Sequence, residues 1–552
     1  MIQCWKCGRE VAETSNFCGR CGAPLKINAI RGTADESAAN RNTADRNSAG
    51  GGAGILGIDL GGSTARIAVI RDGRPVVIPG RNGEKGCPAA VGFRDGRLIV
   101  GEEAQRQADT RPGDTALNFK ARMGSGAEIP LGGKTYTPQL LSALVLKKLR
   151  MDAKAYLNEV PEDAIITIPN SYTYRQRQAV LEAGRMAGLK VNRLISNTAA
   201  ASLGTGWYGE NAGRVLLCSM GSVNFDVSVT EFTDGVAEVL ASGGSTTLGG
   251  NDFTECITRW ILSRFRLDTG IDLKNDPVAL ARVYSAAETA KKQLSELTSV
   301  QITIPCAGIR EGQPLHFDET LTRSEFEEMT LFLRERARGL ILGVLYDAKL
   351  SPNDLQRVVF VGGGSRIPSM KNMVCQVTGR EITKIARPEE CAACGAAILG
   401  GVRHGDIRDV LLLDVTPFSL GIETAGGVFT KLIPRDTTIP IKKAQVFSTF
   451  EDNQVAVDVH VLEGEGVQAA ENETIGSFRI SGIPPAKRGV PLIEVTFDVD
   501  QNGVFSMHAK DVATGKEQRL EQLDRPVGTE ERVQRDTALV NEAASRWGDV
   551  LS

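Results

Sequence analysis

Residues 55–70, ILGIDLGGSTARIAVI, predict a hairpin of two buried strands joined by a glycine turn. The first apolar run, 55–59, ends in Asp59, and the second covers 66–70. The turn between them contains Gly61, Gly62 and Ser63. Backbone N–H groups at such a turn suit a phosphate, and a carboxylate at its entrance suits a hydrated Mg²⁺. The alternative is an ordinary hairpin with a glycine turn.

A second stretch, VLLCSMGSVNFDVSV at residues 215–229, repeats this pattern of strand, glycine turn and strand. Asp226 follows this turn, so each hairpin has an Asp close to its turn, Asp59 in the first and Asp226 in the second. Two such hairpins suggest a duplicated domain that closes two phosphate loops around one nucleotide, which is the plan of the actin-like ATPase fold. A Walker-type site does not match, because the chain has no GxxxxGK[ST] motif.

Composition limits the class of protein. The 552 residues are enough for about three to four domains, and 41% hydrophobic with 24% charged residues is typical of a soluble globular chain. A net charge of −3 gives no electrostatic argument for nucleic acid or an anionic membrane. No apolar run approaches the ~20 residues that span a bilayer, and the N-terminus lacks the basic-then-apolar pattern of a signal peptide. We therefore expect a cytoplasmic protein.

The first 26 residues predict a zinc ribbon. They contain two CxxCG knuckles whose thiolates suit a tetrahedral Zn²⁺ site, namely Cys4, Cys7, Cys18 and Cys21. A module this short cannot bury a core, so the metal would supply its folding energy. The alternative is a redox CxxC pair, which should occur once and at a helix start. Residues 27–53 are polar and of mixed charge, which predicts a flexible linker.

Residues 54–407 predict an α/β domain. Strand-like runs include 97–100, 163–168 and 357–361, and helical runs include 137–157, 174–187, 253–265, 277–297 and 324–348. Further glycine turns open helices near 248–253 and 361–368, where the helix N-terminus suits an anion. Cys391 and Cys394 form another CxxC within a helical run; they are either a thiol pair on one face or small packed residues.

The pattern then changes. The apolar run between Asp409 and Asp414 predicts a strand, or an interdomain linker over 408–414 that docks and undocks. Apolar residues alternate with mostly polar ones over 455–461 and 493–499, and a turn at 500–503 predicts a hairpin. These signals predict a β-sandwich over 415–528. A short amphipathic helix is expected within the last segment, 529–552.

Residues 54 to about 530 resemble the seventy-kilodalton heat-shock chaperones, in particular the bacterial type. The resemblance rests on IDLGGST, AAETAKKQLS, VFVGGGSRIP, DVLLLDVTPFSLGIET, TTIP, QVFSTFEDNQ, RGVPLIEVTFDVDQNG and MHAKD, in the family's order. It implies a domain that binds ATP or ADP with Mg²⁺, a docking linker, and a sandwich that holds extended apolar peptide and opens when ATP binds. Unfolded polypeptides, a J-domain cochaperone and a nucleotide exchange factor are the implied partners.

The resemblance also implies roles for individual residues, by their match to the family's motifs. For catalysis and the Mg²⁺ shell these are Lys120, Asp59, Asp226 and Pro169. For the nucleotide they are Gly61, Gly62, Ser63, Gly221, Asn224, Gly250, Glu288, Lys291, Ser295, Gly363, Arg366 and Ile367. For interdomain coupling they are Arg193, Leu411, Leu412 and Asp414. For peptide they are Ile422, Ala425, Val428, Phe447, Phe450, Val457 and Val459, for each of which core packing is the alternative.

Departures from the family pattern concentrate around the metal and the phosphates. Ser219 and Asn197 stand where the family has carboxylates, and Asn224 replaces a threonine. Ser222 and Val223 replace two glycines. Because phosphoryl transfer depends on positioning and electrostatics, and one well-placed group is worth about 10²–10³ in rate, we expect ATP binding with slow or absent hydrolysis. The opposing interpretation is that neighbouring groups compensate.

Three functions follow from these patterns. The first is an ATP-gated chaperone that releases peptide quickly, because most of the family's helical lid is missing and the terminal segment 529–552 would be only a remnant of it. The second is a nucleotide-sensing adaptor that holds one dedicated partner through the zinc ribbon or the sandwich. The third is a sugar or acetate kinase, which uses the same ATPase fold; the linker and the sandwich argue against it.

Overall fold

The computed structural model describes residues 54–207, 212–408, 410–501, 503–519 and 530–548, and the backbone of two short strands near the N-terminus. The chain divides into two compact units, Met1–Gly52 and Ala53–Ser552. In the first unit, β1 (Ile2–Gln3) pairs antiparallel with β2 (Glu10–Val11). The four cysteines of the predicted zinc site lie outside the described residues.

The first lobe of the second unit is built on a mixed sheet with the order β13-β12-β3-β4-β5. The 55–70 stretch forms its centre, as an antiparallel hairpin in which Ile58 lies opposite Ile67. Both residues are almost fully buried, because this part of the sheet has helices on both faces. The strands are β3 (Leu56–Asp59), β4 (Thr64–Arg71), β5 (Arg74–Val77), β12 (Asp163–Ile168) and β13 (Lys190–Ser196).

The second lobe repeats this arrangement in the order β19-β14-β15-β16-β20-β23. In each lobe the phosphate-loop hairpin is antiparallel, and its first strand also pairs in parallel with a later strand: β3 with β12, and β14 with β19. The duplication predicted from the two hairpins is confirmed. The strands are β14 (Gly213–Met220), β15 (Phe225–Thr233), β16 (Val236–Ser245), β19 (Arg357–Val361), β20 (Leu411–Val415) and β23 (Thr438–Ile439).

Two helices join the lobes. Helix α10 (Cys391–His404) packs on β3 and β4, α4 (Asn197–Gly204) packs on β14 and β15, and the two helices pack on each other. Their backbones approach so closely that a Cβ at Gly395 would lie 1.7 Å from the carbonyl oxygen of Ala200. The run of small residues in α10 therefore serves helix packing.

The other helices match the sequence pattern within a few residues, with one correction. The helix expected over 324–348 is two helices, broken at Thr330, whose backbone leaves the helical region and whose buried hydroxyl donates to the Phe326 carbonyl at 2.7 Å. The helices are α1 (Glu102–Gln107), α2 (Pro138–Leu157), α3 (Tyr174–Met186), α5 (Gly250–Thr269), α6 (Pro277–Gln293), α7 (Arg323–Met329), α8 (Leu331–Asp347) and α9 (Pro368–Thr378).

Further strands complete both lobes, and they are short in the first lobe and long in the second. In the first lobe they are β6 (Cys87–Pro88), β7 (Val91–Arg94), β8 (Arg97–Val100), β9 (Thr115–Ala116), β10 (Ile129–Leu131) and β11 (Lys134–Tyr136). In the second lobe, β17 (Ser299–Arg310) and β18 (Gln313–Thr322) form a long hairpin that packs on α6. This hairpin was not predicted from the sequence.

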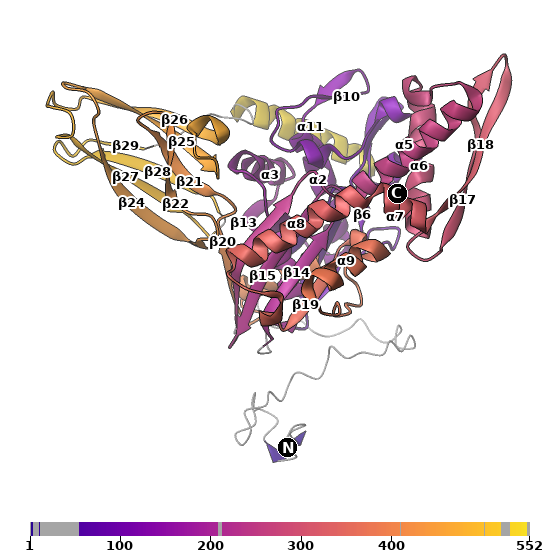
Figure 1. The fold of residues 1–552 in the computed structure, drawn as a ribbon, viewed down its shortest axis with the longest axis horizontal. Coiled ribbons are helices and arrows are strands. Elements are labelled where there is room, and N and C mark those ends of the chain that lie inside the picture. Colours follow the sequence, from indigo (N-terminus) through magenta and orange to yellow (C-terminus); the bar gives the residue numbers. More distant parts are fainter. Residues whose placement is uncertain are drawn as a thin grey trace. The chain divides into compact units, whose positions relative to one another are not determined.

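Within the described residues, 419–519 form two four-stranded antiparallel sheets, β22-β21-β25-β26 and β24-β27-β28-β29 (Figure 1). Val461, Phe497 and Ala509 are fully buried between them, as the alternating pattern predicts. The strands are β21 (Ser419–Thr424), β22 (Val428–Ile433), β24 (Ile441–Ser448), β25 (Ala456–Gly464), β26 (Glu473–Ser481), β27 (Leu492–Val499), β28 (Phe505–Asp511) and β29 (Glu517–Arg519).

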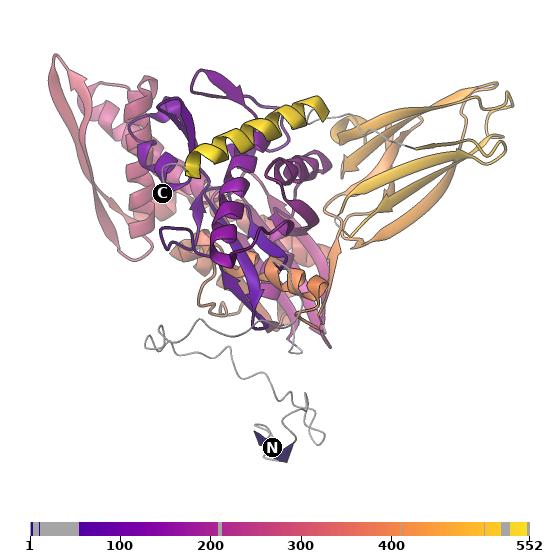
Figure 2. The ribbon, with the colours of Figure 1, turned by 180° about the vertical axis from the view of Figure 1, so that it is seen from behind.

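The last helix, α11 (Glu530–Gly548), lies across α2 and α3 of the first lobe (Figure 2). Its apolar residues Val533, Val540 and Trp547 belong to the same hydrophobic core as the first sheet. The Trp547 indole Nε1 also donates to the Leu98 carbonyl at 2.9 Å. The predicted amphipathic helix is confirmed, and its apolar stripe is part of the core of the first lobe.

Candidate functional site

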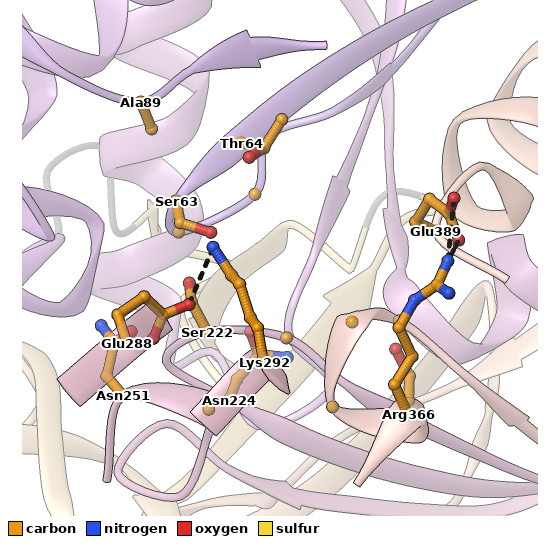
Figure 3. Close-up of a pocket in the computed structure, with 18 of the residues that line it drawn as sticks. Ser63, Thr64, Ala89, Ser222, Asn224, Asn251, Glu288, Lys292, Arg366 and Glu389 are labelled. Carbon is orange, nitrogen blue, oxygen red and sulfur yellow. Dashed lines mark hydrogen bonds and ion pairs between the residues drawn. The ribbon is translucent and has the colours of Figure 1, made fainter. Parts of the chain in front are cut away.

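A cavity of about 740 Å³ is lined by the turns of both hairpins. Ser63 and Thr64 approach it from the first hairpin, and Ser222 and Asn224 from the second (Figure 3). Residues predicted to bind nucleotide meet here from parts of the chain that are far apart in sequence: Gly61, Gly62, Ser63, Gly221, Asn224, Gly250, Glu288, Lys291, Ser295, Gly363, Arg366 and Ile367 all line the cavity.

Both glycines of the first loop are required by close packing, Gly61 within its own loop and Gly62 against the second loop. A Cβ at Gly62 would lie 2.5 Å from the Ser222 hydroxyl and 2.7 Å from Cγ2 of Val223. A Cβ at Gly61 would lie 2.0 Å from the Thr64 carbonyl oxygen. The buried Val223 side chain thus contacts the opposite loop, and Val223 is not among the residues that line the cavity.

One end of the cavity carries a network of charges on α6. The Lys291 ammonium donates to Glu288 Oε2 at 2.6 Å and to the Gly250 carbonyl at 2.9 Å, and Lys292 lies 3.2 Å from Glu288 Oε1. Burial by itself would raise the pKa of Glu288. The nearby lysines and the hydrogen bonds to its carboxylate have the larger combined effect and lower the pKa. This network holds Glu288 and Lys291 in place beside Gly250.

The end of the cavity that is predicted to bind the base is lined by the turn and the helix N-terminus that follow β19. Arg366 lies within 3.2 Å of Glu389, so its guanidinium is held across this end of the cavity. Gly363 and Ile367 flank it in the same turn. Tyr284, which sequence reasoning missed, also lines the cavity and gave no motif signal of its own.

At the opposite end, Asp226 is fully buried and surrounded by N–H donors. Its Oδ1 accepts from the backbone N–H of Asn170 at 3.0 Å. Its Oδ2 accepts from the Asn197 side-chain amide at 2.9 Å and from the Asn224 amide. Burial raises the pKa of Asp226 to about 6, although these hydrogen bonds oppose the shift. Asn170 was missed from the sequence; its position directly after Pro169 was the available signal.

Lys120 and Asp59 lie at the same end. Lys120 is almost fully buried and donates to the Leu60 carbonyl. Burial lowers the pKa of the Lys120 ammonium, and Asp59 and Asp226 oppose that shift. Asp59 accepts from the Thr167 hydroxyl at 3.2 Å and lines the cavity. Asp226 and Pro169, by contrast, are not among the lining residues.

The residues predicted for interdomain coupling meet at the edge of the second sheet. Strand β20 pairs in parallel with β16, with Leu412 buried opposite Ala237 and Leu411 half exposed. Asp414 accepts from the Ser196 hydroxyl at 3.1 Å. Burial lowers the pKa of Arg193, an effect that the nearby Asp414 opposes. Residues 411–414 of the predicted linker therefore belong to strand β20, which is paired with the second sheet.

Contacts between the sandwich and the lobes were not predicted from sequence. Buried Glu463 accepts from the Tyr174 backbone N–H at 2.7 Å, and burial raises the pKa of its carboxyl to about 8. Arg435 donates to Asp347 at 2.8 Å, and Asp436 accepts from the Ser242 backbone N–H at 2.9 Å. No local motif marks these residues, because each contact joins residues far apart in the chain.

The seven predicted peptide residues are divided between the core and the surface. Ile422 and Val459 belong to the sandwich core, and Phe447 and Val457 are half-buried against it. The exposed members are Ala425, Val428 and Phe450. Phe450 is 63% exposed, which is unusual for a large aromatic side chain. The surface members are thus the ones available to a ligand.

The second CxxC pair packs within α10. Burial raises the pKa of Cys391 to about 12 and that of Cys394 to about 11. Both thiols therefore stay protonated near neutral pH, and a protonated thiol is a poor nucleophile and a poor metal ligand. The packing interpretation is favoured over a reactive pair.

Two family models match the chain. One, described as Hsp70 protein, matches residues 55–131 and 125–546. The other, described as zinc-ribbon domain, matches residues 3–25. In the part of the chain that the structure describes, no helix is both long and apolar enough to cross a membrane.

Proposed function

Because the chain belongs to the Hsp70 family and carries an N-terminal zinc ribbon, we propose that it is a chaperone whose sandwich binds extended apolar peptide under nucleotide control. ATP binding and a chaperone role belong to the family in general. The proposed domains are the zinc ribbon at 1–26, the linker at 27–53, the ATPase domain at 54–407, the docking linker at 408–414, the sandwich at 415–528 and a terminal helix segment at 529–552. The proposed compartment is the cytoplasm.

The observation that carries this proposal is the shared cavity between the two loops. Every predicted nucleotide residue lines it, and its volume of about 740 Å³ suits a ligand of nucleotide size. The docked strand β20 connects the second sheet to the sandwich, which supports coupling between the two sites.

Hydrolysis is proposed to be slow or absent. Asn197 and Ser219 occupy positions where the family has carboxylates, and the Asn197 amide donates to Asp226. An amide donor in place of an acceptor cannot orient the water molecules around a metal ion in the same way. Because one misplaced group costs about 10²–10³ in rate, the two substitutions together support ATP as a long-lived ligand.

A single-turnover experiment tests this function. The ATP complex is formed, free nucleotide is removed, and ADP is followed with and without a labelled apolar peptide. We expect ATP to stay largely uncleaved, and fresh ATP to speed peptide release from the sandwich. Rapid ATP cleavage stimulated by peptide would contradict slow hydrolysis. A rate of peptide release that is the same with and without ATP would contradict nucleotide control.

A dedicated adaptor is the second candidate, favoured by the altered second phosphate loop together with the added ribbon. The two candidates differ in breadth of binding. A chaperone should bind many unrelated apolar peptides in an array, and Phe450→Ala should weaken all of them because this side chain is exposed. An adaptor should bind few or none, and Phe450→Ala should then leave the array unchanged.

A further inference from the structure

The phosphate end of the cavity presents hydrogen-bond donors where a hydrated cation needs acceptors. Asn197 and Asn224 line the cavity and donate to Asp226, which does not line it. The two amides therefore separate the Asp226 carboxylate from the cavity. Each side-chain amide has two N–H groups, so one N–H of each residue remains after the contact with Asp226.

Magnesium fits this end poorly. Mg²⁺ gives up its water reluctantly and keeps several water molecules, whose hydrogens need acceptors on the protein. Asp59 provides one carboxylate, and Asn197 provides a buried Oδ1 with no hydrogen-bond partner among the described residues. In the same part of the chain, no group of three or more His, Cys, Asp or Glu side chains could hold a metal ion.

The charge balance points in the same direction. Lys120 is the buried cation at this end, opposite Asp59 and Asp226. The Lys120 ammonium offsets one carboxylate, and the amides of Asn197 and Asn224 cover Asp226, so Asp59 is the carboxylate that a phosphate would face at this end. Phosphate therefore meets an ammonium, two amides and the backbone of two glycine turns with little opposing charge.

We propose that this cavity holds the phosphates of ATP or ADP directly, through Lys120 and the side-chain amides of Asn197 and Asn224, so that nucleotide affinity does not depend on Mg²⁺. The proposal rests on the proposed nucleotide-binding function and specifies the form of the ligand, which is the metal-free nucleotide. The two asparagines take the place of the metal as partners of the phosphates.

The test is calorimetric titration of ADP and ATP into the full chain at several Mg²⁺ concentrations. Magnesium-depleted buffer without chelator is used, because a chelator would also remove zinc from the ribbon. We expect Kd to change by less than about threefold between depleted buffer and saturating Mg²⁺. Tightening by about tenfold or more, which corresponds to about 1.4 kcal/mol, would overturn the proposal.

A variant that restores acceptors should create the missing metal dependence. Asn197→Glu combined with Ser219→Asp adds two carboxylates at the phosphate end, and we expect it to bind nucleotide at least about tenfold more weakly without Mg²⁺ than with it. Gln105→Glu is the matched control, because it adds a carboxylate at an exposed position of the cavity lining. Equal metal dependence in the double variant and in this control would contradict the role given to Asn197.

The possible outcomes distinguish failure of metal-free binding from failure of the proposed nucleotide-binding function. Binding of nucleotide only when Mg²⁺ is present would overturn the metal-free mode and leave the nucleotide-binding function intact. No binding under either condition would overturn the proposed function itself. The comparison in the unmodified chain decides the proposal even where the double variant fails to fold.

Discussion

At the scale of single residues, Glu463 carries the clearest pH effect. Its carboxyl is buried where the sandwich meets α3 and accepts from the Tyr174 backbone N–H, and burial raises its pKa from 4.5 to about 8. A carboxyl whose pKa is raised in the folded state binds more protons there than in the unfolded chain. Its contribution to stability is therefore complete below about pH 4.5 and is lost as pH rises through about 8.

The corresponding prediction concerns Glu463→Gln. Glutamine keeps the acceptor for the Tyr174 N–H and cannot ionise, so the variant should resemble the original chain at pH 5 and exceed it in stability by about 1–3 kcal/mol at pH 9. Urea unfolding at both values measures this. Asp458→Asn, which removes a carboxyl at an exposed position of the same strand, is the control and should change stability little at either pH. Equal stability of both proteins at pH 9 would contradict the prediction.

At the scale of elements, two short segments owe their structure to distant partners. Strand β20 is held by pairing with β16, and α11 is held by α2, α3 and β8. Thr330 shows the reverse case, because the backbone leaves the helical region there and divides a helix that the sequence pattern predicts as continuous. The structural roles of β20 and α11 can each be tested by changing one side chain.

For β20, the chain supplies a matched pair of adjacent leucines. Leu412 is 4% exposed and Leu411 is 52% exposed on the same strand. Leu412→Ser should undock the strand and slow ATP-triggered peptide release by about tenfold or more, because a polar group would enter the core. Leu411→Ser should have little effect. Stopped-flow fluorescence of a labelled peptide measures both, and equal effects would contradict docking as the means of coupling.

For α11, Trp547 is the critical side chain. Trp547→Ala removes a buried indole and its hydrogen bond to the Leu98 carbonyl, and should destabilise the first lobe by about 3–5 kcal/mol. Ser545→Ala, at an exposed position of the same helix, should change stability by less than about 0.5 kcal/mol. Urea denaturation followed by circular dichroism measures both. An unchanged midpoint for Trp547→Ala would mean that the helix does not stabilise the lobe.

At the scale of the whole molecule, the chain consists of two compact units, Met1–Gly52 and Ala53–Ser552. The first contains all four cysteines of the predicted zinc site, and every residue that lines the nucleotide cavity lies in the second. The predicted zinc site and the proposed nucleotide site therefore lie in separate compact units. Loss of one site should leave binding at the other intact.

The test is to replace Cys4 and Cys18 with Ser. The double variant should lose its zinc, measured by elemental analysis, because two thiolates cannot complete a tetrahedral site. Its affinity for ADP should stay within about twofold of the original, measured by calorimetry. Cys306→Ser, which changes an exposed thiol of the second unit, is the control and should retain zinc. A large loss of ADP affinity in the double variant would show that the units are coupled.

Local sequence patterns were enough to predict the two phosphate-loop hairpins, the α/β lobes, the alternating strands of the sandwich and the amphipathic terminal helix. These predictions were possible because apolar residues recur with a period of two residues in strands and 3.6 residues in helices. Glycine turns are also short motifs that can be recognised locally. The nucleotide residues were predictable for the same reason, through a resemblance carried by short stretches.

The interactions between these parts follow from the three-dimensional fold and could not be predicted from local patterns. The fold placed Asn197 and Asn224 between Asp226 and the cavity, buried Ile422 and Val459 in the sandwich core, and set Glu463 against α3. Each of these facts depends on contacts between residues far apart in the chain. Residue type alone does not determine whether a carboxylate is open to a ligand or covered by neighbouring amides. Nor does it determine whether an apolar side chain is available to bind peptide or is packed in the core. Burial and the contacting residues decide both.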